Sequence, residues 1–155
     1  MIPDTKRTGR ERNYMTDFTG SETYRLRVLL VDDERSIRDL LYALLENEGY
    51  EVVVAGSGEE GLRFFRQSVR PIELLVTDYD MPGMTGLELA RQCSCLSGQL
   101  SVLYVSGSRP DEQLLADLQA RKRAFLAKPF HAGDLLRKAR ELLLDPGSPQ
   151  MSLSR

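Results

Sequence analysis

Residues 74–83 read LLVTDYDMPG, an apolar run that ends abruptly in two aspartates, Asp78 and Asp80, before a Pro-Gly turn. Three kinds of site place an acid at the end of a buried strand in this way. The acid can be the nucleophile of an aspartyl-phosphate phosphatase, the ribose-binding acid of a dinucleotide site, or the phosphate acceptor of a signalling switch. The rest of the sequence has to decide between them.

Short β-rich runs alternate with helical patterns on both sides of this stretch. Strands are predicted at residues 27–31, 51–55, 72–77, 101–105 and 124–127. Helices are predicted at residues 35–47, 57–66, 86–96 and 132–144, and a further one opens at Pro110-Asp111-Glu112. Ser57 with Glu60 has the spacing of a capping box. The alternation predicts an α/β fold with a doubly wound, five-stranded parallel sheet and five helices.

The two ends of the chain lack these patterns. Residues 1–24 have no sustained periodicity, and residues 145–155 contain two prolines and a glycine. We therefore expect a mobile N-terminal arm over residues 1–24, a domain over residues 25–144 and a disordered C-terminal tail over residues 145–155.

The bulk composition argues against several classes of protein. Lys and Arg number 21 and Asp and Glu 23, for a formal net charge of −2. This near balance gives no general attraction to nucleic acid or to an anionic membrane. No run approaches the roughly 18 apolar residues of a membrane span, and the N-terminus lacks the apolar core of a signal peptide. We expect a cytoplasmic protein that binds neither nucleic acid nor membrane.

Complementary chemistry follows the predicted strands. In such a sheet, ligands bind beyond the carboxyl ends of the strands. The residues at these ends are Asp32, Asp33, Asp78, Asp80, Ser106, Lys128 and Pro129. Acids crowded at one edge repel one another unless a cation neutralises them, and hard oxygen ligands at a wet rim suit Mg²⁺. A metal, a carboxylate nucleophile, a hydroxyl and an ammonium together suit phosphoryl transfer.

Four motifs in this order carry a resemblance. VLLVDDE (28–34), LLVTDYDMPGMTG (74–86), VLYVSGS (102–108) and FLAKPF (125–130) are similar to the receiver domains of two-component response regulators. The resemblance covers residues 25–144. It implies a flavodoxin-like sheet of strand order 2-1-3-4-5, in a free-standing receiver or in the receiver of a hybrid histidine kinase.

The resemblance also implies roles for the strand-end acids. Asp78 would accept a phosphoryl group from a phosphohistidine, on a histidine kinase or a histidine phosphotransfer protein. Asp33 would ligate Mg²⁺ directly, together with Asp78, and Asp32 would assist, often through water. The backbone carbonyl of Asp80 would complete the metal site. We further hypothesise that the Asp80 carboxylate modulates the lifetime of the phosphoryl group.

Further positions match the switch elements of these receivers. Ser106 would hydrogen-bond the phosphoryl oxygens, and Lys128 would pair with their charge. Pro129 would follow a cis peptide bond that aims Lys128 into the site. Phe125 matches the aromatic switch residue, whose ring turns inward when the hydroxyl residue moves to meet the phosphate.

The implied function is a phospho-aspartate switch that is not a conventional enzyme. It would catalyse only its own phosphorylation and its own slow dephosphorylation. Because eleven residues follow Leu144, we expect output through a protein contact, a relay to another histidine or a module outside this sequence. Residues 121–123, Arg-Lys-Arg, are either a solvated helix end or part of a docking face of the last two helices and last strand, which could also form a dimer.

Three rival functions fit less of the sequence. Residues 56–61 contain G-x-G-x-x-G, but Glu59 and Glu60 would add like charge where a pyrophosphate should sit. The Asp78-Tyr79-Asp80 triplet resembles the motif of haloacid dehalogenase-like phosphatases, yet Pro82 stands where they usually have Thr or Val. A receiver-like module that binds partners without being phosphorylated typically loses an acid or the lysine, and this sequence keeps them all.

Overall fold

The computed structural model describes residues 24–144, which form one parallel five-stranded sheet flanked by helices. The expected tail and all of the expected arm except Tyr24 lie outside the described residues. In chain order the elements are β1 (Arg27–Val31), α1 (Arg35–Asn47), β2 (Glu51–Ala55), α2 (Gly58–Gln67), β3 (Leu74–Asp78), α3 (Gly86–Leu96), β4 (Ser101–Ser106), α4 (Glu112–Asp117), β5 (Arg123–Ala127) and α5 (Ala132–Leu144). The expected alternation is confirmed.

The sheet has the order β2-β1-β3-β4-β5, and every pair of neighbouring strands is parallel. This is the flavodoxin-like order that the resemblance implied. The chain leaves β1 and winds through α1 to β2 on one side, then crosses back through α2 to β3 and on to β5. The reversal falls between β1 and β3, and a doubly wound sheet binds its ligands at this point.

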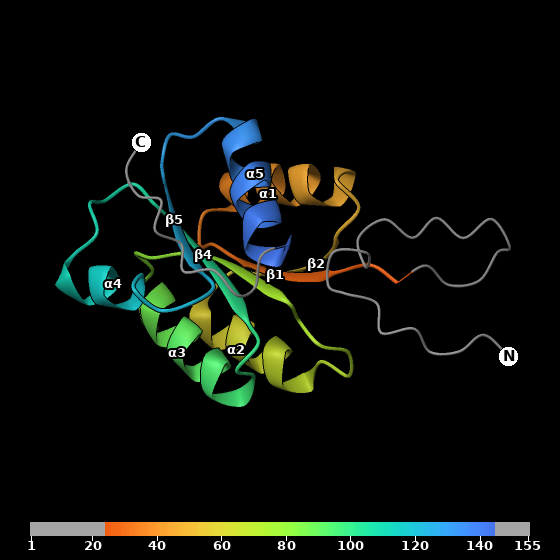
Figure 1. The fold of residues 1–155 in the computed structure, drawn as a ribbon, viewed down its shortest axis with the longest axis horizontal. Coiled ribbons are helices and arrows are strands. Elements are labelled where there is room, and N and C mark those ends of the chain that lie inside the picture. The colour runs from red at the N-terminus through yellow and green to blue at the C-terminus, as the bar shows by residue number, and fades with distance from the viewer. Residues whose placement is uncertain (1–23, 145–155) are drawn as a thin grey trace, which may run out of the picture.

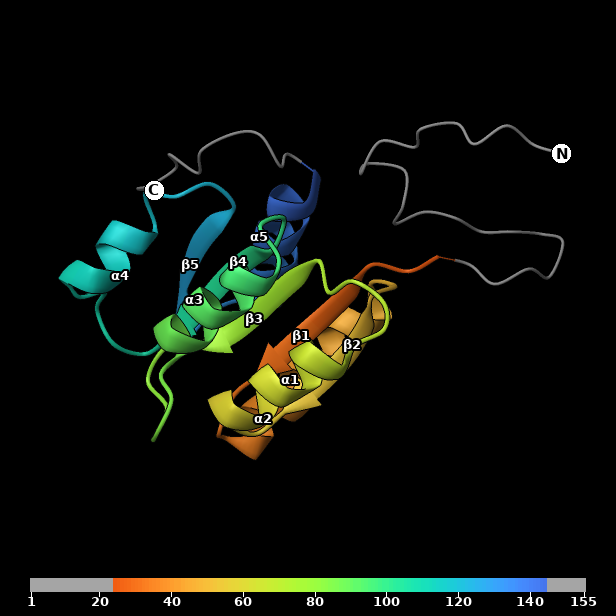
Figure 2. The ribbon, with the colours of Figure 1, turned by 90° about the horizontal axis from the view of Figure 1, so that it is seen from below.

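Helices cover both faces of the sheet. In Figure 1, α1 and α5 lie together on one side of the strands, while α2 and α3 lie on the other side. In Figure 2, α2 and α3 lie in front of the sheet. Side chains alternate along each strand, so Val28 and Leu30 pack under α1 and α5, whereas Leu29 and Val31 pack under α2 and α3. Burial on both faces explains why the strands are continuous apolar runs.

The element ends differ from the predicted ones by a few residues. β3 begins at Leu74, two residues later than predicted, because its pairing with β1 and β4 starts there. Helix α4 is short, and its N-cap is Asp111, whose carboxylate accepts the Leu114 N–H at 2.9 Å. Pro110 therefore precedes the cap and lies outside the first turn.

The predicted capping box at Ser57 is only half formed. Ser57 accepts the Glu60 N–H at 3.1 Å, but the Glu60 carboxylate accepts the N–H of Gly56, the residue before the cap. A complete capping box instead joins Thr85 and Glu88 at the start of α3. The spacing of Ser57 and Glu60 correctly predicted where α2 begins. The backbone N–H that the Glu60 carboxylate accepts depends on the conformation of the loop before the helix.

The interpretation of residues 121–123 as a solvated helix end was wrong for Arg123, whereas the docking-face interpretation stays a prediction. This arginine is 9% exposed and begins β5 instead of lying on the surface. Its guanidinium pairs with Asp117 at 3.2 Å and donates to the Ser94 hydroxyl at 2.8 Å. Asp117 also accepts the hydroxyl of the buried Tyr104 at 2.6 Å. Arg123 is thus the centre of a buried polar cluster that fixes α4 to the sheet.

No helix within residues 24–144 is long and apolar enough to cross a membrane.

Candidate functional site

The predicted strand-end residues meet at the carboxyl edge of the sheet. Asp32 and Asp33 follow β1, Asp78 ends β3 and Ser106 ends β4. Carboxylate oxygens of Asp32, Asp33 and Asp78 all lie within 4.8 Å of one another. Asp32 and Asp78 are buried at 1% and 8% exposure, whereas Asp33 is exposed. The cluster is therefore a shallow site with one side open to water.

Lys128 supplies the positive charge next to these acids. Its Nζ lies 3.1 Å from Asp32 Oδ2 and 3.6 Å from Asp78 Oδ2. Burial alone would lower the pKa of Lys128, but the hydrogen bond and charge of Asp32 and the charge of Asp78 outweigh burial and raise it. The Lys128–Pro129 peptide bond is cis, as expected, and the Lys128 N–H donates to the Ser106 carbonyl at 2.8 Å.

Asp78 holds its proton more tightly than a free aspartate. Burial is the largest cause and raises its pKa to about 6, with Lys128 opposing the rise and the charges of Asp32 and Asp33 adding to it. A single ammonium does not balance three carboxylates. The set consists of hard oxygen donors with access to water, which is the environment that Mg²⁺ takes in proteins. The residues at this edge therefore fit a divalent cation.

Ser106 is directed into the site rather than away from it. Its Oγ donates to Asp80 Oδ2 at 2.9 Å and accepts the Ser108 N–H at 3.1 Å. The Asp80 N–H in turn donates to Asp78 Oδ1 at 3.2 Å. Asp80 thus links the Asp78 carboxylate to the Ser106 hydroxyl through its backbone and its side chain, a link that the sequence analysis did not foresee.

The loop after β3 is held from two sides. On one side, Gly86 presses against Asp78 so closely that a Cβ at this glycine would lie 2.1 Å from the Asp78 carbonyl oxygen. On the other side, the Glu59 carboxylate of α2 accepts the Met84 N–H at 2.9 Å, and Gly83 turns the chain with a φ of +75°. These contacts leave the loop little freedom around Asp78.

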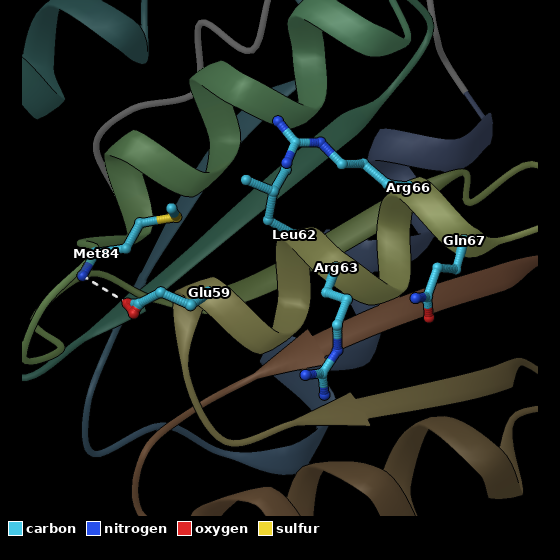
Figure 3. A pocket seen from close by; sticks show the side chains of 6 residues that line it. All are labelled: Glu59, Leu62, Arg63, Arg66, Gln67 and Met84. Carbon is cyan, nitrogen blue, oxygen red and sulfur yellow. Dashed lines mark hydrogen bonds between the residues drawn. The ribbon is translucent and has the colours of Figure 1, made fainter.

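The glycines of the G-x-G-x-x-G stretch face protein atoms. A Cβ at Gly58 would lie 2.8 Å from Met84 Cβ, and one at Gly61 would lie 2.9 Å from a methyl of Val31. Close helix packing accounts for both residues. The pocket nearby has a volume of about 350 Å³ and is lined by Glu59, Leu62, Arg63, Arg66, Gln67 and Met84 (Figure 3). None of the strand-end acids lines this pocket.

The predicted switch residue Phe125 is half-buried on β5 and packs in the same cluster as Tyr79, Tyr104 and Leu118. Tyr79, which follows Asp78, meets the Tyr104 ring edge-on with 6.3 Å between the centroids. Its hydroxyl donates to Asp111, the N-cap of α4, at 2.6 Å. Sequence analysis missed this connection, since no local spacing links residue 79 to residue 111.

Comparison with known proteins decides the family. Residues 28–140 match the profile of the family described as Response regulator receiver domain. The chain belongs to this family. It is 36% identical to Response regulator MprA of Mycobacterium leprae over 118 residues, which cover 76% of this chain and 51% of that protein. It is 32% identical to Response regulator receiver protein CpdR of Brucella abortus over 123 residues, which cover 76% of this chain and 97% of that protein.

A solved relative extends the comparison to structure. Response regulator protein TrrA of Thermotoga maritima, solved in complex with Mg²⁺-BeF, is 32% identical and superposes with a TM-score of 0.67, covering 76% of this chain and 99% of that one. The present chain spans about half the length of the first curated relatives, 49% in two of them. Receiver domains bind Mg²⁺ at an acidic pocket and work with histidine kinases or phosphotransfer proteins.

Proposed function

We propose that this receiver is a phospho-aspartate switch in a two-component phosphorelay, with Asp78 as the phosphate acceptor. The observation that carries the proposal is the position of the Asp78 carboxylate. It shares a cluster with two further carboxylates and lies 3.6 Å from the Lys128 ammonium. A nucleophile next to a potential cation site and a fixed positive charge suits phosphoryl transfer, in which positioning and charge neutralisation supply most of the catalysis.

The transfer begins with a phosphohistidine of a histidine kinase or phosphotransfer protein. An Asp78 oxygen bonds to phosphorus while the bond from phosphorus to the imidazole nitrogen breaks, and the imidazole keeps the electron pair and takes up a proton. Lys128 stabilises the charge on the phosphoryl oxygens, and Ser106 donates a hydrogen bond to one of them once it leaves Asp80. The hydroxyl must therefore exchange one acceptor for another.

Dephosphorylation regenerates the free Asp78 carboxylate. A water oxygen bonds to phosphorus, the bond to the Asp78 oxygen breaks, and the carboxylate leaves while the phosphate keeps the protons of the water. The chain would catalyse both steps only on itself, so it is not a conventional enzyme.

Mg²⁺ is the proposed cofactor. Asp33 and Asp78 would hold it directly, Asp32 would assist through water, and the Asp80 carbonyl would complete the protein ligands. When bound, the ion would neutralise carboxylate and phosphoryl charge. The support is the convergence of Asp32, Asp33 and Asp78, with Lys128 as the one cation of residues 24–144 that forms an ion pair with the cluster.

Output would follow from Ser106 and Phe125, the proposed switch pair. A new dianionic group at Asp78 would draw the hydroxyl away from Asp80, and the Phe125 ring would then move inward on packing alone. The downstream contact, a dimer through the last two helices and the last strand, a cytoplasmic location and the absence of nucleic-acid binding stay predictions from the sequence.

The test is phosphorylation with a small donor. The chain is incubated with acetyl phosphate and Mg²⁺, and its intact mass is measured over time. We expect one phosphate adduct that requires Mg²⁺ and is absent in Asp78→Ala. Absence of any adduct in the wild type would favour the unphosphorylated binding module. Turnover of many equivalents of a generic phosphomonoester would favour the haloacid dehalogenase-like phosphatase.

A further inference from the structure

Of the three clustered carboxylates, Asp33 has the least support. Asp32 accepts the Glu34 N–H at 2.8 Å and pairs with Lys128, and Asp78 accepts the Asp80 N–H. The exposed Asp33 carboxylate makes no hydrogen bond or ion pair with any other residue of the range 24–144. Its direction therefore depends on the backbone, and in particular on the peptide unit that joins it to Asp32.

Arg38 holds that peptide unit. Its Nη1 donates to the backbone carbonyl oxygen of Asp32 at 2.8 Å. Side chains on a helix point back toward its N-terminus, so an arginine in the first turn of α1 reaches the loop that precedes the helix. A hydrogen bond from a charged donor is roughly twice as strong as a neutral one. The bond opposes rotation of the plane that directs the Asp33 side chain.

Gly56 makes room for the guanidinium. A Cβ at this position would lie 3.3 Å from Arg38 Nη1 and 3.6 Å from its Cζ, which is tighter than ordinary packing. The Gly56 N–H is itself held by the Glu60 carboxylate at 2.9 Å. The planar Arg38 group thus lies between the loop after β1 and the loop after β2, and both loops limit its movement.

We propose that Arg38 is a positioning residue for the cation site: it fixes the Asp32–Asp33 peptide so that the Asp33 carboxylate faces Asp32 and Asp78. This inference rests on the cation site of the proposed function. Positioning by Arg38 should strengthen metal binding. Its positive charge alone should weaken metal binding, because a cation beside a metal site repels the metal ion. The two effects have opposite signs, and an experiment can separate them.

The measurement is Mn²⁺ affinity of the full chain, from the electron paramagnetic resonance signal of free Mn²⁺, with Mg²⁺ affinity by competition. We expect Arg38→Met to bind Mn²⁺ about fivefold or more weakly than the wild type, the effect of losing a charged hydrogen bond to a group that sets a ligand. The matched control is Arg35→Met, which removes the same charge from an exposed position in the same turn. It should change the affinity less than about twofold, in the direction of tighter binding.

Two further variants separate positioning from general damage. Arg38→Lys keeps the charge but lacks the planar fork, and we expect it to lie between Arg38→Met and the wild type. Gly56→Ala keeps the arginine but displaces it by a few tenths of an ångström, and about a twofold loss of affinity is expected. In all variants, saturating Mn²⁺ should bring acetyl phosphate labelling of Asp78 close to the wild-type rate, because the defect is in holding the ion.

Unchanged or tighter Mn²⁺ binding by a folded Arg38→Met would overturn the inference and leave the proposed function intact. If Arg38→Met does not fold, wild-type affinity in both Arg38→Lys and Gly56→Ala would overturn it equally. If the wild type binds no Mn²⁺ at any concentration, the cation site of the proposed function fails, and the role of Arg38 fails with it.

Discussion

The Ser106 hydroxyl donates a hydrogen bond to the Asp80 carboxylate, with 2.9 Å between Oγ and Oδ2. The two residues come from the end of β4 and the loop after β3. The hydroxyl that we propose as a donor to the phosphoryl group is therefore already bonded to an acid. In the proposed mechanism, the incoming phosphoryl group displaces this acid, whose negative charge repels it.

The first prediction follows from this competition. Asp80→Asn keeps the backbone carbonyl but removes the charge, so phosphorylation by acetyl phosphate should be about two- to fivefold faster. The phosphorylated state should also last about two- to fivefold longer, because the carboxylate charge that would orient the attacking water is gone. Intact mass over time measures both rates. Asp39→Asn, an exposed acid on α1, is the control. Unchanged half-lives in Asp80→Asn would remove Asp80 from the mechanism.

The second prediction concerns the charge of Lys128. Its ammonium lies near Asp32 and Asp78, so Lys128→Met removes the ion-pair partner of both acids. In EDTA the variant should lose about 2 kcal/mol of unfolding free energy, since one side of a largely buried ion pair is missing. Mg²⁺ should restore most of this loss by supplying the charge. Urea unfolding with and without Mg²⁺ checks both statements, with Lys138→Met on α5 as control. A variant equally stable in EDTA and in Mg²⁺ would contradict the role of charge.

The type and order of the helices and strands could be predicted because their signals are local. Apolar runs of five or six residues, helical stripes and the order of the strand-end motifs all lie within short windows of sequence. The residues of the acid cluster were equally predictable, since parallel strands bring their carboxyl ends to one edge. Strand ends such as Leu74 were less predictable, because they depend on where pairing with β1 and β4 begins.

The supporting contacts could not be predicted, because they join residues far apart in the chain. The bond of Ser106 to Asp80 and that of Tyr79 to Asp111 connect loops that share no sequence signal. Arg123 was misassigned because two basic neighbours gave it the pattern of a solvated surface. Its burial depends on Asp117 and Ser94, which lie on two different helices.

The third prediction uses the pH dependence of Asp78. Burial raises its pKa from an ordinary value of 3.8 to about 6. The folded chain binds this proton more tightly than the unfolded one, so the contribution to stability is full below about pH 3.8 and is lost as the pH rises through about 6. In EDTA, the stability of Asp78→Asn relative to the wild type should therefore increase as the pH rises from about 4 through about 6.

The size of this difference is bounded by the shift. Two pKa units correspond to at most about 3 kcal/mol, and contact with water on the open side of the site reduces this to about half. Urea unfolding of both proteins across the pH series gives the difference directly, and Mg²⁺ should shrink it. A difference that stays constant with pH would mean that Asp78 titrates alike in the folded and unfolded chain.

The fourth prediction compares neighbouring arginines. Arg123→Met leaves the Asp117 carboxylate, 14% exposed, without its ion-pair partner and should cost about 3 kcal/mol of unfolding free energy. Arg121→Met removes the same charge from an exposed position and should cost less than about 0.5 kcal/mol. Hydrogen exchange should also quicken in α4 of Arg123→Met, because Asp117 ends that helix. Equal stability of the two variants would return Arg123 to the surface role first inferred for it.

The fifth prediction concerns Gly86, where α3 meets Asp78, the proposed acceptor. A Cβ here would lie 2.1 Å from the Asp78 carbonyl oxygen, a contact that only a backbone shift can relieve. Gly86→Ala should cost about 3 kcal/mol of unfolding free energy, as overpacking against backbone does. It should also slow acetyl phosphate labelling, because the shift moves Asp78 relative to Lys128. Gly98→Ala is the matched control, since a Cβ there meets nothing within 4 Å, and it should be neutral. Equal stability and labelling in both variants would mean that α3 does not fix the acceptor.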